Sequence, residues 1–143
     1  MDICHERGLE TPRLPQETIN KLKEVVSPKV RSIASLVNPL DMTGSAVDED
    51  YVAVARVLAE SPHVDCILIV IVPYSAGISV DLGAKLSHAC GYTGKPVFAY
   101  VPKDEKYRML IEGFEYNHIP VAPSVEGTVM MIEALRRHKD ENQ

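Results

Sequence analysis

The chain has 143 residues, a length that usually folds around one hydrophobic core, and hydrophobic residues make up 45% of it. Its 15 lysines and arginines against 20 aspartates and glutamates give a formal net charge of −5. This charge argues against a nucleic-acid partner, because non-specific binding to nucleic acid depends on clustered basic side chains. The longest apolar run, residues 66–72, is far too short to cross a bilayer, so no membrane partner is predicted.

The N-terminal residues and the cysteines indicate the compartment. Residues 1–7 have no apolar signal region and include acidic side chains, so the sequence predicts a cytoplasmic protein. Cys4, Cys66 and Cys90 lack the spacing of metal ligands, and one of them lies in an apolar run. We expect three reduced, structural thiols and no metal site.

Residues 1–35 are predicted to form a helical lead-in to the main domain. Ile19, Leu22 and Val26 share one face of a helix over residues 15–26, and Pro15 suits its first turn because a missing N–H is harmless there. The Ser27-Pro28 pair is expected to end this helix.

Residues 36–138 alternate between strand and helix patterns. The expected elements are a short extended segment at 36–40, helices at 47–60, 79–90, 105–116 and 125–137, strands at 66–72, 97–101 and 119–122, and a polar tail at 139–143. The strands are continuously apolar, which is typical of a parallel sheet covered on both faces. The sequence therefore predicts an α/β fold: a flavodoxin-like three-layer sandwich with a mainly parallel sheet, preceded by an N-terminal helix.

Two loops are the candidate sites, because ligands bind at the carboxyl ends of the strands in an open parallel sheet. Glycines there allow close backbone approach, and free N–H groups at helix N-termini attract phosphate or carboxylate. The first loop, within residues 73–79, offers Ser75, Ala76, Gly77, Ile78 and Ser79 for phosphate binding; the second offers Asn38, Asp41, Thr43, Gly44 and Ser45. The alternative is that these residues only cap helices.

Several segments together carry a resemblance to a known family. Residues 38–44 (Asn-Pro-Leu-Asp-Met-Thr-Gly) are close to an Asn-Pro-Val-Asp-hydrophobic-Thr-Gly motif, and the segments at 4–12, 94–97 and 117–121 match in position. Over nearly its whole length the chain resembles the ligase-CoA domain of the nucleoside-diphosphate-forming acyl-CoA synthetases. It most resembles the C-terminal domain of the alpha subunit of ADP-forming acetyl-CoA synthetase, and is similar to the corresponding beta-subunit domain of succinyl-CoA synthetase.

The resemblance implies a role within a larger enzyme. In this family a phosphohistidine on another domain carries phosphate between an acyl-CoA site and a nucleotide site, and helix N-termini of two flavodoxin-like domains hold the phosphoryl group. The turn at residues 74–78 matches one of these in position, with one glycine where succinyl-CoA synthetase has an adjacent pair. The implied partners are CoA-binding, phosphohistidine and ATP-grasp domains, with a possible homo-oligomer; ATP or ADP, Mg and CoA belong to the complete enzyme, and this chain is expected to hold no cofactor.

No catalytic residue is predicted in the chain itself. None of the five histidines has the family's Ser-His-Thr-Gly or Gly-His-Ala-Gly context, and His88 is expected on a helix surface. Ser75, Asp81 and His88 invite a triad interpretation, but the flanking glycines of a nucleophile elbow are missing. Neither a phosphate-binding P-loop nor a dinucleotide fingerprint is present, so a nucleotide site is expected elsewhere.

Two hypotheses follow. The first is a domain or subunit piece of an ADP-forming acid-CoA ligase, inactive alone, which helps to bind the phosphoryl group and to assemble the enzyme. The second is a stand-alone flavodoxin-like module that binds a small anion or a protein and has no catalytic partner. Neighbouring coding sequence for the three partner domains would favour the first hypothesis, and its absence would favour the second.

Overall fold

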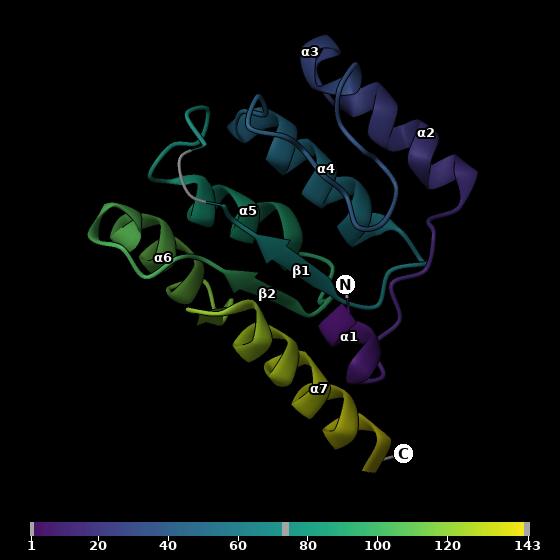
Figure 1. Cartoon of the computed structure of the whole chain (residues 1–143), viewed down its shortest axis with the longest axis vertical. Coiled ribbons are helices and arrows are strands. Elements are labelled where there is room, and N and C mark those ends of the chain that lie inside the picture. The colour runs from purple at the N-terminus through teal and green to yellow at the C-terminus, as the bar shows by residue number, and fades with distance from the viewer. Residues whose placement is uncertain (1, 73–74, 142–143) are drawn as a thin grey trace.

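The computed structural model describes residues 2–72 and 75–141, which fold into alternating helices and strands (Figure 1). In chain order these are α1 (Asp2–Glu6), α2 (Gln16–Val25), α3 (Pro28–Arg31), α4 (Asp48–Glu60), β1 (Ile67–Val70), α5 (Leu82–Gly91), β2 (Val97–Tyr100), the 3-10 helix η1 (Glu105–Tyr107), α6 (Arg108–Glu115), β3 (Val121–Ala122) and α7 (Val125–Glu141). The predicted alternation after residue 47 is confirmed.

The sheet is parallel throughout, in the order β1-β2-β3. Ile67 lies opposite Val97, and Ala99 lies opposite Val121. Helices α4, α5 and α6 pack side by side, while α7 contacts β2 and β3 and carries α1 against it (Figure 1). The helices therefore cover both faces of the sheet, and the predicted α/β class with an N-terminal helix is confirmed.

Helices α5 and α6 pack with their backbones unusually close. A Cβ added at Gly83 would overlap the carbonyl oxygen of Leu110 and lie 3.1 Å from the nitrogen of Phe114. A Cβ at Gly113 would lie 2.7 Å from the nitrogen of Ala84. Only glycine permits this approach, which draws the two helices together over a core that includes the fully buried Phe114.

The lead-in packs on α4 and forms a second, smaller core. Leu22, Val26 and Val30 are buried there. The carboxylate of Asp50, 3% exposed, accepts hydrogen bonds from the Ser27 amide at 2.7 Å, the Ser27 hydroxyl at 3.2 Å and the Val47 amide at 3.2 Å. One buried side chain thus joins the α2–α3 corner to the start of α4.

The expected extended segment at residues 36–40 is wrong as a strand of the sheet. Two hydrogen bonds link the main chains of Ser35 and Asp41, at 3.0 and 2.8 Å, so the intervening residues close into a loop that contains a cis Asn38–Pro39 bond. Within the described residues β1 is consequently an edge strand.

Three helix boundaries also differ from the prediction. Helix α5 begins at Leu82 rather than near Ser79, because Ser79 and Asp81 are engaged in side-chain contacts before the helix starts. Helix α7 continues to Glu141, into the expected polar tail. Ser27 and Pro28 end one helix but also begin α3, since the Ser27 hydroxyl accepts the Val30 amide at 3.5 Å.

Candidate functional site

The two candidate loops lie directly against each other. A Cβ added at Gly77 would overlap the Ala46 carbonyl oxygen and lie 3.1 Å from a methyl carbon of Val47. Residues 75–79 therefore pack on the segment that leads from the second loop into α4. The turn at 75–79 and the end of the second loop are therefore neighbours, although only one of the two loops follows a strand of the sheet.

The second loop is held by its own side chains. Asn38 donates to the Pro12 carbonyl at 3.1 Å, Asp41 accepts the Thr43 amide at 2.9 Å, and the Thr43 hydroxyl accepts the Ser45 amide at 3.3 Å. Thr43 has a φ of 61°, which is rare for a β-branched residue and costs about 1–3 kcal/mol. The positive φ of this loop falls on Thr43 and not on Gly44, which is exposed and has open space around it.

Tyr51 of α4 connects the two loops, and sequence reasoning did not find it. It faces the Ser75 side chain and lies near the carboxylate of Asp41. Burial raises the pKa of the Tyr51 hydroxyl and the Asp41 charge adds to this, while the Ser75 side chain opposes it. The tyrosine therefore stays neutral at physiological pH and lies between the two loops.

Asp48, the first residue of α4, is the second group that sequence reasoning missed. Its carboxylate, 5% exposed, accepts the Ser79 amide at 2.9 Å, the Lys85 ammonium at 2.7 Å and the Ser79 hydroxyl. The Ser79 hydroxyl also lies against Asp81, which forms an ion pair with Lys85 at 3.2 Å. The first turn of α4 contains three acidic residues, Asp48, Glu49 and Asp50. The sequence does not indicate which of them contacts the turn before α5, because that contact depends on the tertiary fold.

The charges in this cluster oppose a nucleophilic role for Ser79. Burial raises the pKa of Asp48, but hydrogen bonds from Lys85 and Ser79 outweigh burial and hold the pKa below its ordinary value. Hydrogen bonds to Asp48 and Asp81 raise the pKa of Lys85. Lys85 is therefore cationic at neutral pH and cannot accept the Ser79 proton as a general base.

The acidic side chains of this cluster exclude an anion from the Ser79 end of the turn at residues 75–79. The Ser79 amide donates to Asp48 and the Ser79 hydroxyl lies between Asp48 and Asp81, and two carboxylates against one ammonium leave this end of the turn negative. The Ile78 amide is directed at the Ser75 carbonyl at 3.5 Å. The amides of Ala76 and Gly77 donate to no other described residue, so they are the part of the predicted phosphate site that is open to an anion. Pro73 and Tyr74 lie outside the described residues.

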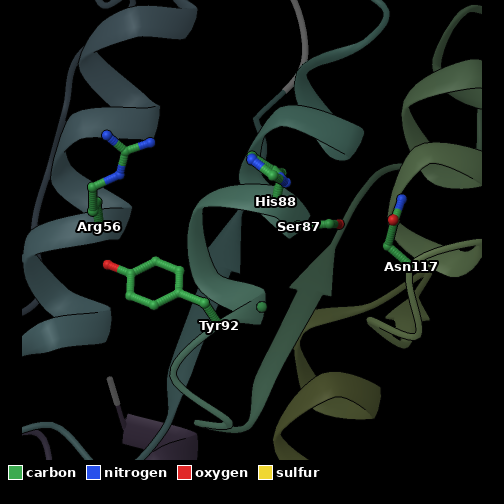
Figure 2. A pocket seen from close by; sticks show the side chains of 6 residues that line it. Arg56, Ser87, His88, Tyr92 and Asn117 are labelled. Carbon is green, nitrogen blue, oxygen red and sulfur yellow. The ribbon is translucent and has the colours of Figure 1, made fainter.

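The triad considered from the sequence is not assembled. Ser75 contacts Tyr51, Asp81 contacts Ser79 and Lys85, and His88 is exposed on α5, on the surface expected for it. His88 instead lines a groove of about 470 Å³ (Figure 2). Within residues 2–72 and 75–141 no group of three or more acidic, histidine or cysteine side chains is arranged to hold a metal ion.

Solved structures define the class of protein that this fold represents. The chain superposes with a TM-score of 0.80 on a protein of Pyrococcus horikoshii OT3, at 30% identity over 94% of the chain and 31% of that protein. It superposes equally well, with a TM-score of 0.80, on dinucleotide forming acetyl-coenzyme A synthetase 1 of Ca. Korarchaeum cryptofilum, over 94% of the chain and 29% of that enzyme. At 22% identity this second similarity concerns the fold.

One curated relative is more specific. The chain is 32% identical, over 94% of its length, to the alpha subunit of ADP-forming acetate–CoA ligase II of Pyrococcus furiosus, and it covers 29% of that subunit. No protein-family model matches the chain. The resemblance drawn from the motifs is confirmed: the chain is similar to a domain-sized part of ADP-forming acetyl-CoA synthetases and spans less than a third of these relatives. None of the described helices is long and apolar enough to span a membrane.

Proposed function

We propose that the chain acts as one domain of an ADP-forming acid-CoA ligase and works only together with the other domains of that enzyme. The observation that carries this proposal is its 32% identity to an ADP-forming acetate–CoA ligase subunit of which it covers 29%. The CoA-binding, phosphohistidine and ATP-grasp domains, with the sites for CoA, Mg²⁺ and ATP or ADP, then lie outside these residues.

The role proposed for this domain is electrostatic. The loops at 43–46 and 75–78 pack together where α4 and α5 begin, so backbone N–H groups and the positive ends of two helix dipoles lie at one edge of the sheet. A phosphoryl group delivered on a histidine of another domain would be stabilised there by Ala76 and Gly77, away from the acids beside Ser79.

Exposed apolar side chains at the same edge support contact with other domains. Val47, Val72, Val80 and Met109 are all exposed, and each lies in or beside a loop at the carboxyl ends of the strands or the helix N-termini that follow. Exposed apolar groups that gather around one site are typical of a surface that other protein covers.

A domain exchange tests the proposal. These residues replace the matching segment of the Pyrococcus furiosus alpha subunit, and the hybrid is assembled with the rest of that ligase. We expect ATP formation from acetyl-CoA, ADP and phosphate, together with a labelled phosphohistidine, whereas the isolated chain should give neither. Turnover by the isolated chain would refute the proposed dependence, and a folded, assembled hybrid without phosphohistidine would refute the proposed role.

A further inference from the structure

A groove of about 470 Å³ lies between the helices of one layer and away from the candidate loops (Figure 2). It is lined by Arg56 of α4, by Ser87, His88 and Gly91 of α5, by Tyr92, and by Asn117 after α6. A second hollow of about 290 Å³ shares Ser87, Gly91 and Asn117 and extends the groove toward His118. Figure 2 shows Arg56 and Tyr92 on one side of His88, and Asn117 on the other.

A guanidinium and an imidazole are available on this surface. Within the described residues, the side chains of Arg56 and His88 form no hydrogen bond or ion pair, and both are exposed. The buried Ser87 hydroxyl donates to the Gly83 carbonyl at 2.8 Å, and Asn117 donates to the Gly113 carbonyl at 2.7 Å. The arginine and the imidazole are therefore the groups left to meet a ligand.

One exposed tyrosine, Tyr92, lines the groove with Arg56 and His88, and a second, Tyr116, precedes Asn117 in the chain. Tyr92 is 61% exposed and Tyr116, next to Asn117, is 80% exposed. The Tyr92 hydroxyl donates to Glu60, one turn beyond Arg56, which fixes the ring beside the guanidinium. Tyrosine and arginine on an open surface are the residues that most often carry binding energy at protein interfaces.

We propose that this surface, the Arg56–His88 groove, binds an acidic segment of a partner protein through carboxylate contacts to Arg56 and His88. The groove is shallow and flanked by exposed rings, whereas a small-molecule site encloses most of its ligand. The C-terminal end of α5 at Gly91 carries partial negative charge and repels a carboxylate. The bidentate hydrogen bonds that a guanidinium donates to a carboxylate are strong enough to outweigh this repulsion. The proposal does not depend on the phosphoryl-binding role, since it uses neither candidate loop.

The test is an NMR titration of the full chain with a capped octaglutamate peptide in low-salt buffer. We expect the amides of His88, Gly91, Tyr92 and Asn117 to move most, and about 0.5 M NaCl to suppress the shifts. An octalysine peptide and inorganic phosphate serve as comparison ligands. Equal shifts with phosphate would replace the proposal by a simple anion site, and the absence of shifts with octaglutamate would overturn it.

Two variants locate the binding groups. Arg56→Ala and His88→Ala should each weaken octaglutamate binding by about fivefold or more, as expected for the loss of a charged contact. Arg136→Ala is the control: it removes an exposed arginine from α7, which does not line the groove, and it should leave the affinity unchanged. Equal weakening by all three variants would indicate non-specific charge attraction and refute the groove as the site. Unchanged melting curves separate lost contacts from unfolding.

Discussion

Gly77 is required by packing between the two loops, which is a second reason for the residue beyond the anion contact suggested by the sequence. A methyl group there would meet the Ala46 carbonyl oxygen. We expect Gly77→Ala to lower the free energy of unfolding by about 1–3 kcal/mol, as overpacking usually does. Gly44→Ala is the matched control, because nothing lies within 4 Å of its added Cβ. Urea denaturation measures the free energy of unfolding of both variants. Equal values for Gly77→Ala and Gly44→Ala would show that the two loops can move apart without loss of stability.

Asp48 should make stability depend on acid pH. Its pKa is lower in the folded chain than the value of about 4 in the unfolded chain, so its contribution is complete above that value. The contribution is lost as the pH falls through the folded pKa. We expect Asp48→Asn to cost about 2 kcal/mol at neutral pH and much less at pH values below both pKa values, measured by urea denaturation.

The control for Asp48 is its neighbour in the cluster. Asp81 is solvent-exposed and pairs with the same lysine, so solvent screens its interaction. Asp81→Asn should change stability less than Asp48→Asn at neutral pH. If the Asp48→Asn and unmodified curves stayed parallel from neutral to acid pH, the ion pair would have no role in the pH dependence.

His118 occupies a backbone conformation that glycine adopts more easily. Its φ is 64°, and it closes α6: its amide donates to the Glu115 carbonyl and the Ile119 amide donates to the Phe114 carbonyl, both at 3.0 Å. We expect His118→Gly to stabilise the chain by up to about 1 kcal/mol, because the αL strain is removed. Thermal unfolding should show a rise of a few degrees, and a fall would contradict this reasoning.

At the scale of elements, the contact between α5 and α6 depends on Gly83. The Leu110 carbonyl oxygen occupies the place of a Cβ, so Gly83→Ala should force the helices apart and destabilise the chain by about 1–3 kcal/mol. Gly91→Ala, at the exposed end of the same helix, meets no atom within 4 Å and should be neutral or slightly stabilising. Thermal melts of the pair give the comparison, and similar values would refute the close-packing argument.

The elements that were predicted well are those set by local pattern. Apolar runs identified the strands, and an apolar face identified α2, because both signals arise from the residues of the element itself. The extended segment expected at 36–40 is not a strand of the sheet, and the pairing of Ser35 with Asp41 that closes it into a loop leaves no apolar pattern in the sequence.

In the candidate site, too, the features set by local sequence were predicted and those set by tertiary contacts were not. Turn residues revealed the loops, but Tyr51 and Asp48 join them through contacts across long sequence separations, and no spacing reports such contacts.

For the whole molecule, the lead-in is part of the cooperative unit. Tyr51, Leu58 and Val64 pack against both hydrophobic cores, and Asp50 joins Ser27 to the start of α4. We expect the chain to unfold in one transition, and a fragment of residues 36–143 to lose most of its stability because the second core loses Leu22, Val26 and Val30 and Asp50 loses its hydrogen bonds from Ser27. Circular dichroism and calorimetry should agree on one midpoint. A fragment that melts like the full chain would show that residues 1–35 are dispensable.

The position of β1 at the edge of the sheet bears on how the protein behaves in a concentrated sample. Its outward-facing main-chain groups have no partner strand within the described residues, Val70 and Val72 are exposed beside them, and residues 66–72 contain no charge or proline. Natural proteins usually protect an edge strand with a lysine, a proline or a bulge, because unpaired main-chain N–H and C=O groups can pair with strands of other molecules. We expect slow self-association in a concentrated sample to start at this strand, and Val70→Lys to reduce it with little effect on the melting temperature.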